Sequence, residues 1–195
     1  MVSATVGFCI MAGVVAIGGC ASADADGDRS APQLSVERIA GIVASPDRSA
    51  ADRANDLRRK PIDMLDFIGV RPGMVALDIS AGGGYTTELL ARAVGPTGRV
   101  YGQSQPSASP PPASPPAAAT PPRRTSAMAL AERAKTVPNI VAVGRPFDDP
   151  VPPELASGSL DLVTLMFNYH DFGSLGVDRA AMNKAVFAAL KPGGV

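Results

Sequence analysis

Residues 74–85 read Met-Val-Ala-Leu-Asp-Ile-Ser-Ala-Gly-Gly-Gly-Tyr, and this stretch decides the fold. Its first half, Val75 to Ile79, has the apolar character of a parallel strand that is buried on both faces. Its second half ends in three glycines, and residues 86–94 continue with helix formers until Gly95-Pro96. The stretch therefore predicts a strand, a glycine-rich turn and a helix in direct succession.

The glycine turn predicts a binding site for a nucleotide-like ligand. Because glycine has no Cβ, a ligand can approach the backbone of Gly82, Gly83 and Gly84 closely. The N–H groups at the start of the following helix can then hold an anionic group of that ligand.

The rest of the chain supplies further elements of an α/β fold. Asp178 is an expected N-cap, and Met182, Val186 and Leu190 form an apolar stripe at helical spacing behind it. We expect strands over residues 98–103, 139–143 and 160–167, and helices over residues 34–43, 61–68, 127–135 and 178–190.

The turn resembles the first motif of the class I S-adenosylmethionine-dependent methyltransferases, an acidic residue followed by three glycines at alternate positions. Asp78, Ser80, Gly82 and Gly84 stand in those places, with Ser80 instead of the first glycine. The order of later segments is similar too: a strand over 160–167, a polar tetrad, a helix and the turn Leu-Lys-Pro-Gly-Gly. The tetrad Asn168-Tyr169-His170-Asp171 resembles a narrower set of exported bacterial predicted methyltransferases.

This resemblance covers residues 56–195 and implies a Rossmann-like, doubly wound α/β sheet. The sequence reaches Val195 where the family's fifth strand should begin, so the expected sheet is incomplete and lacks the last three strands. We expect one partial methyltransferase-like domain over residues 34–195.

The resemblance also implies S-adenosylmethionine as cofactor. Its carboxylate would lie near Gly82, Gly83 and Gly84, and its ribose near Gln103, where the family usually has an acidic residue. The family's adenine contact corresponds to Asp148, although a turn or cap is an equally open role for that residue. The expected cofactor-binding set is Asp78, Ser80, Gly82, Gly83, Gly84, Gln103 and Asp148.

Asn168, Tyr169 and His170 are the candidate catalytic residues, because ligands of open α/β sheets lie beyond the carboxyl ends of the strands. His170, with an ordinary pKa of about 6.5, can take a proton from a hydroxyl or amine acceptor. The alternative is that these side chains only hydrogen-bond across the strand–helix junction. The methyl acceptor, expected to be a small molecule, and the oligomeric state are left open.

Charge and composition argue against other classes of function. Lys plus Arg equals Asp plus Glu, 18 each, so nucleic acid is not an expected partner. A basic cluster over residues 58–60 is interpreted as solvated surface. One histidine and two cysteines do not make a zinc site of the usual composition.

The N-terminus resembles a bacterial export segment. The first 23 residues carry no charge, and Ile17-Gly18-Gly19-Cys20 resembles a lipoprotein cleavage box. We expect an export signal over residues 1–20, a lipid on Cys20, a tether over 21–33 and a membrane-anchored periplasmic protein. An uncleaved membrane helix and a misassigned start codon are the alternatives, and without a functional signal the protein would be cytoplasmic.

Residues 104–126 contain eight of the 19 prolines and have no large apolar side chain. Proline locks φ and lacks an N–H, which predicts an extended, disordered segment where the fold expects a helix. It is either an inserted linker or the product of a local reading-frame error.

These observations favour a methyltransferase-like enzyme. The competing hypotheses are an exported lipoprotein that keeps the fold as a binding module, and an inactive truncated product. A dehydrogenase is disfavoured because the glycine spacing is not Gly-x-Gly-x-x-Gly.

Overall fold

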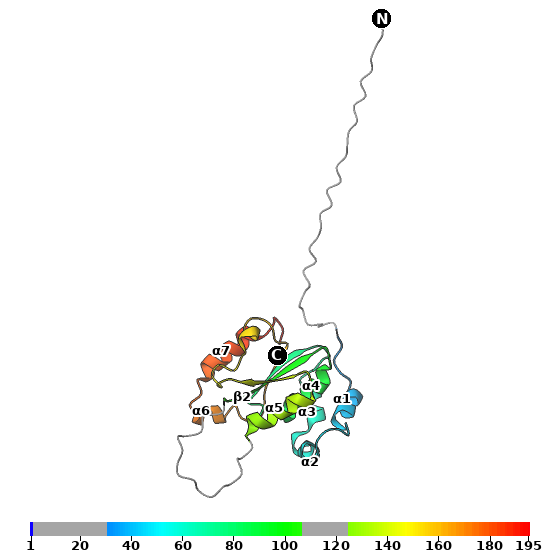
Figure 1. Ribbon diagram of the computed structural model, residues 1–195, viewed down its shortest axis with the longest axis vertical. Helices are drawn as coiled ribbons and strands as arrows, with labels where there is room; N and C mark the ends of the chain where they lie inside the picture. The colour runs from blue at the N-terminus through cyan, green and yellow to red at the C-terminus, as the bar shows by residue number, and fades with distance from the viewer. Residues whose placement is uncertain (2–30, 107–124) are drawn as a thin grey trace.

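The computed structural model describes residues 1, 31–106 and 125–195, and there four parallel strands form one sheet in the order β3-β2-β1-β4 (Figure 1). The predicted Rossmann-like α/β fold is confirmed, and the predicted strands are present with small shifts at their ends. The strands are β1 (Val75–Ile79), β2 (Arg99–Ser104), β3 (Ile140–Gly144) and β4 (Leu162–Leu165).

The strand order reverses at β1. After β1 the chain adds β2 and then β3 on one side, and β4 returns to the other side, where Asp78 is in register with Thr164. On the first side Asp78 is in register with Gly102. A reversal of this kind leaves a crevice at the carboxyl ends of the central strands, which is where open α/β sheets bind ligands.

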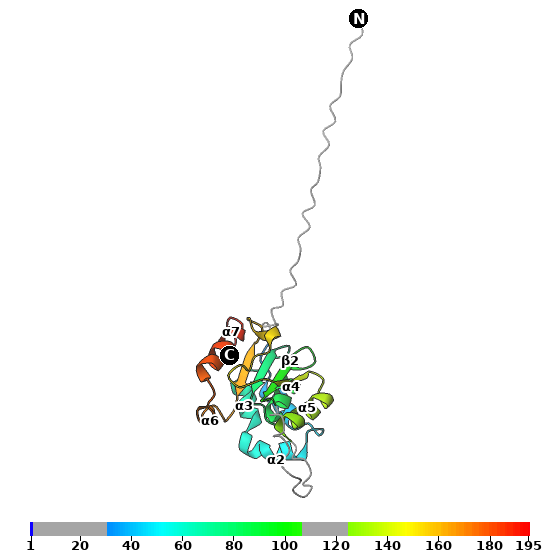
Figure 2. The same ribbon diagram turned by 60° about the vertical axis from the view of Figure 1, so that its left-hand side comes forward.

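Helices cover both faces of the sheet, as Figures 1 and 2 show. Alternate residues of β1 point to opposite faces. Ala76 packs in a core with Leu65, Leu90 and Leu130, whereas Leu77 packs in a second core with Phe172 and Met182. The helices are α1 (Val36–Val43), α2 (Ala50–Arg59), α3 (Pro61–Phe67), α4 (Tyr85–Val94), α5 (Ser126–Thr136), the 3-10 helix η1 (Pro153–Leu155), α6 (Asp171–Ser174) and α7 (Arg179–Ala189).

Helix α2 was not expected from the sequence. It begins after Ser49, whose hydroxyl accepts a hydrogen bond from the N–H of Asp52 over 3.0 Å. It ends at Lys60, which adopts a left-handed conformation with φ of 43°, and Pro61 then opens α3. The short helix α6 was also not expected, whereas the predicted cap of α7 is confirmed: Asp178 Oδ1 accepts from two N–H groups.

The two end residues of the segment expected to be disordered, 104–126, belong to regular elements instead. Ser104 is the last residue of β2 and Ser126 is the first residue of α5, the helix that the fold expects between β2 and β3. Residues 107–124 lie outside the described residues, and so do the expected export segment and Cys20.

Val195 lies along β4, because its N–H donates to Asp161 O over 3.1 Å and its carbonyl accepts from the N–H of Val163 over 2.7 Å.

Within the described ranges, no helix has both the length and the apolar character needed to span a bilayer.

Candidate functional site

The glycine turn between β1 and α4 has three residues with positive φ. These are Ser80 (φ 56°), Gly82 (58°) and Gly84 (86°). Glycine adopts this region without steric cost, whereas Ser80 needs support from its surroundings. That support comes from Gln103 at the end of β2, whose Oε1 accepts a hydrogen bond from the N–H of Ser80 over 2.8 Å.

Gln103 is fully buried and both ends of its amide are engaged. Besides the bond to Ser80, its Nε2 donates to Arg145 O over 2.6 Å. It therefore braces the turn from behind, and because the side chain is fully buried, a ribose could reach it only if the surrounding segments moved. Ser104 and Gln105 follow it and line a cavity in front of the turn.

Two cavities adjoin at Ser80 and Gly82, which line both of them. The first, here called the glycine cavity, measures about 390 Å³, and the second, the outer cavity, about 440 Å³. The glycine cavity is lined by Asp52, Asn55, Arg59, Asp78, Ser80, Ala81, Gly82, Gly83, Tyr85, Thr86, Arg133, Met166, Phe167 and Asn168. The outer cavity is lined by Ser80, Gly82, Ser104, Gln105, Thr125, Ser126, Ala127 and Phe147.

Asp78 is a buried carboxylate of the glycine cavity. Thr87 Oγ1 donates to Asp78 Oδ2 over 2.6 Å, and Thr164 Oγ1 donates to Oδ1 over 2.8 Å. Burial raises the pKa of Asp78 to about 6, although the two hydroxyl groups oppose that rise. Because burial makes the carboxyl group of Asp78 easier to protonate, a cation that enters the cavity would favour its ionised form.

Arg59 brings a guanidinium to the same cavity. Its Cζ lies 4.4 Å from the ring centroid of Phe167 and 5.5 Å from that of Tyr85. The sequence interpretation of residues 58–60 as solvated surface is therefore wrong for Arg59, because its Nε is buried. The backbone of Phe167 has a φ of 74°, a conformation that bulky residues rarely adopt.

Asn168 joins β4 to the glycine turn. Its Nδ2 donates to Ser80 Oγ, while its Oδ1 is buried without a hydrogen-bond partner among the described residues. Buried polar atoms are nearly always paired, so an unpaired acceptor beside a cavity indicates a partner supplied by a ligand or by water.

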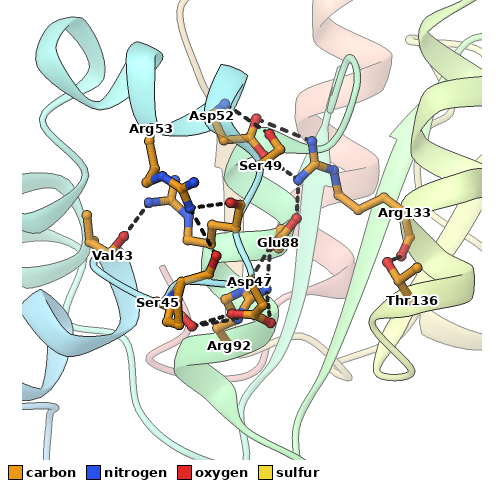
Figure 3. Close-up of polar contacts among 12 residues, drawn as sticks. Val43, Ser45, Asp47, Ser49, Asp52, Arg53, Glu88, Arg92, Arg133 and Thr136 are labelled. Atoms are coloured by element: carbon orange, nitrogen blue, oxygen red, sulfur yellow. Dashed lines mark hydrogen bonds and ion pairs between the residues drawn. The ribbon is translucent and has the colours of Figure 1, made fainter.

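Arg133 of α5 fixes the rim of the glycine cavity (Figure 3). Its Nη1 lies 2.7 Å from Asp52 Oδ2 of α2 and also pairs with Glu88 of α4. Its Nε donates to Gly83 O over 2.9 Å, which adds the turn itself to the network. Three helices and the turn are therefore tied together by one guanidinium.

The structure brings five of the expected site residues together: Asp78, Ser80, Gly82, Gly83 and Asn168 line the glycine cavity. Gly84 lies at the start of α4, where an added Cβ would come 2.9 Å from Leu130 Cδ1 of α5. Asp148, Tyr169 and His170 are exposed and line neither cavity.

Arg59, Tyr85, Phe167 and Arg133 were missed as site residues. The signal for Arg59 was available in part, since Ser49 with Asp52 three residues later is typical of a helix start. That helix, α2, carries Arg59 to the cavity. In the part of the chain that the structure describes, no cluster of three His, Cys, Asp or Glu residues could hold a metal ion.

Comparison with known proteins supports the fold. The structure is similar to an S-adenosylmethionine-dependent methyltransferase from Aquifex aeolicus, with a TM-score of 0.54 at 16% identity. The match covers 82% of this chain and 69% of that one. The chain has the class I S-adenosylmethionine-dependent methyltransferase fold.

Other similarities to methyltransferases are partial. Residues 61–106 match the family described as Protein-L-isoaspartate(D-aspartate) O-methyltransferase. A Thermotoga maritima S-adenosylmethionine-dependent O-methyltransferase gives a TM-score of 0.46 at 16% identity, over 82% of this chain and 47% of that one. Aeropyrum pernix fibrillarin, solved with natively bound S-adenosyl-L-methionine, gives 0.41 at 19%, over 64% and 44%. The chain thus spans less than half of these two proteins, and no curated protein matches its sequence.

Proposed function

We propose that this protein binds S-adenosylmethionine and transfers its methyl group to a small-molecule acceptor. The observation that carries the proposal is the pair of adjoining cavities over the glycine turn, at the point where the strand order reverses. Two cavities meeting at Ser80 and Gly82 suit a ligand with two chemically different halves, an amino-acid end and a nucleoside.

The residues present fit such a cofactor. A Cβ added at Gly82 would meet no atom within 4 Å, so the space over this residue is open to a ligand. The glycine cavity is polar and suits the amino-acid end, and the outer cavity suits the nucleoside. There Ser104 and Gln105 replace Gln103 as ribose contacts, and the ring of Phe147 offers an apolar surface to the base.

Positioning supplies the catalysis in this proposal. A bound sulfonium presents an already activated methyl carbon, so the protein has mainly to align the acceptor with it. Asn168, Tyr169 and His170 follow β4, and we assign the acceptor to that side of the site. The side chain of His170 is 78% exposed, and its Nε2 lies 3.2 Å from Asp171 Oδ1, so the imidazole is accessible to an acceptor on that side.

The test is methyl transfer from labelled cofactor to a panel of hydroxyl, amine and carboxyl acceptors. His170→Ala and Asn168→Ala should each reduce turnover, and Lys184→Ala, an exposed residue of α7, is the matched control. Full activity in both site variants would remove their catalytic role. Cofactor binding without transfer to any acceptor would indicate a binding module.

We also propose that residues 1–20 direct export and that Cys20 carries a lipid anchor. The support is the uncharged N-terminal segment with its Ile-Gly-Gly-Cys sequence. Metabolic labelling with a radioactive fatty acid should mark the wild-type chain and not Cys20→Ser. Equal labelling of both would contradict the proposal.

A further inference from the structure

A further cavity, here called the arginine cavity, lies at the opposite end of the strands from the glycine turn. It measures about 570 Å³, and its wall includes Arg99, the first residue of β2, and Asn139, which directly precedes β3. The glycine turn follows the carboxyl end of β1, so the length of the parallel sheet separates the two places. The volume of the arginine cavity falls in the range of small-molecule sites.

Three arginines and one aspartate are the charged residues among those described that line the arginine cavity. Arg92 of α4 is engaged, because its guanidinium pairs with Asp47 and with Glu88 (Figure 3). Arg38 of α1 and Arg99 of β2 form neither a side-chain hydrogen bond nor an ion pair with any residue that the structure describes. The cavity therefore has two guanidinium groups free to bind an anion.

The carbonyl groups of the nearby helix ends do not require Arg38 or Arg99. The carboxyl ends of α1, α4 and α5 meet at the cavity, and a cation at such a place could bind the last C=O groups of a helix. Other side chains already donate to carbonyl groups at all three ends: Asn139 to Ala91 and Gly95 of α4, Thr136 to Arg133 of α5, and Arg48 to Val43 of α1. The two arginines are therefore not the caps of these helices.

Much of the remaining wall is apolar. Ile42, Ala91 and Val137 line it together with Pro96 and Pro138. An inorganic ion would leave this surface in contact with water, whereas an organic group would bury it. Guanidinium groups bind phosphate through paired N–H donors, and a phosphate monoester carries about 1.5 to 2 negative charges at pH 7. Two free guanidinium groups beside an apolar wall therefore match a phosphate monoester with an apolar body.

We propose that the arginine cavity is a second ligand site, in which Arg38 and Arg99 bind the phosphate of a small phosphate monoester. Ile42 and Val137 contact the apolar part of that ligand. The proposal goes beyond methyl transfer, because this cavity shares no lining residue with the glycine cavity or the outer cavity. The ligand and the cofactor can therefore be bound at the same time.

Calorimetric titration of the full chain with phenyl phosphate tests the proposal. Inorganic phosphate carries the anion without the apolar body, and phenol carries the body without the anion. Phenyl phosphate should bind at least about 5-fold more tightly than either of them, since each alone lacks one set of contacts. S-adenosylhomocysteine, the cofactor after loss of its methyl group, should not compete with phenyl phosphate, and Gly82→Ala should bind phenyl phosphate like the wild type.

Arg38→Ala and Arg99→Ala should each weaken phenyl phosphate binding about 10- to 100-fold, the range for hydrogen bonds to charged groups. Both residues are exposed, so their melting temperatures should equal that of the wild type. Arg58→Ala is the matched control, because Arg58 is exposed, lines none of the three cavities and gives the same change in charge. It should alter the affinity by less than about 2-fold. Arg99→Lys should recover only part of the loss, because an ammonium lacks the bidentate fork.

The proposal is overturned if the wild type does not bind phenyl phosphate, or if inorganic phosphate binds equally well. It is also overturned if Arg38→Ala and Arg99→Ala weaken binding no more than Arg58→Ala does. Competition by S-adenosylhomocysteine would place the phosphate over the glycine turn and would contradict the proposal as well. The proposed methyl transfer would survive each of these results, because it is measured separately with labelled cofactor.

Discussion

Gln103 Oε1 accepts a hydrogen bond from the N–H of Ser80, and this 2.8 Å contact fixes the end of β2 to the glycine turn. The same amide donates to Arg145 O beyond β3. One fully buried side chain thus connects three of the segments that line the outer cavity, and the start of α5 is the fourth.

Gln103→Ala should therefore reduce stability. The change leaves the Ser80 N–H and the Arg145 carbonyl without partners and opens a small void, at a cost of about 2–4 kcal/mol. Chemical denaturation measures this loss. Gln105→Ala, two residues on and exposed, should stay within about 0.5 kcal/mol of the wild type. An unchanged free energy of unfolding in Gln103→Ala would contradict the bracing role.

Alanine substitutions at Gly82 and Gly84 should separate ligand binding from folding. At Gly82 the added Cβ meets only open space, so the cost is backbone strain of about 1–2 kcal/mol, but the methyl group enters the cavities. We expect a folded protein with weakened affinity for S-adenosylhomocysteine, measured by titration.

At Gly84 the same positive φ is combined with contacts of 2.9 Å to Leu130 Cδ1 and 3.0 Å to Arg133 Cδ. Gly84→Ala should therefore destabilise the fold by more than Gly82→Ala does, by about 1–3 kcal/mol of added strain. Equal melting temperatures for the two variants would show that the packing of α5 on the turn is not as described.

Asp78 makes stability depend on pH. Its pKa is about 6 in the folded protein against 3.8 ordinarily, so the folded state binds the proton more tightly than the unfolded state. The contribution of Asp78 is therefore greatest below about pH 4 and is lost as pH rises through about 6, a total of about 3 kcal/mol.

The substitution Asp78→Asn removes this pH-dependent contribution to stability, and the new amide can still hydrogen-bond Thr87 and Thr164. The difference in unfolding free energy between wild type and variant should shift by about 2 kcal/mol in favour of the variant from pH 4 to pH 7. Carboxylates such as Asp56, whose pKa Arg48 lowers, act in both proteins and cancel. A difference independent of pH would refute the assignment.

Arg133→Met should loosen α2. It leaves the buried carboxylate of Asp52 without its cation, at a cost of about 3 kcal/mol, and releases Gly83 O. Hydrogen exchange should then accelerate over residues 50–59. Lys135→Met on the same helix is the control, because its pair with Glu132 is exposed and contributes little.

Adding Asp52→Asn to Arg133→Met should recover part of the stability, because no unpaired charge remains. If the double variant is less stable than Arg133→Met alone, burial of an uncompensated carboxylate is not the cause of the loss.

The sheet and the turn could be predicted from sequence because their signals are local. β1 shows as an apolar run, the turn as three glycines, and α7 as a capped apolar stripe behind Asp178. Asp78 could be placed at the site because it lies near the carboxyl end of β1. Asn168 could be placed there because it follows β4, which pairs with β1.

The rest depends on contacts between distant segments. Helix α2 is rich in charged residues and is stabilised by ion pairs such as Arg48 with Asp56 at 2.8 Å. Its sequence therefore has no apolar stripe from which a helix could be predicted. Arg59 becomes a site residue only because Phe167 and Tyr85 lie against it. Gln103 turns inward because Ser80 and Arg145 offer it a donor and an acceptor, which a sequence pattern does not show.

Equilibrium dialysis of the full chain against labelled S-adenosylmethionine measures cofactor binding over the glycine turn. We predict saturable binding of one molecule per chain, competition by S-adenosylhomocysteine, and strong weakening in Gly82→Ala, whose methyl group enters both cavities. Absence of saturable binding to the folded wild type, or equal binding by folded Gly82→Ala, would show that the cofactor does not bind over the glycine turn.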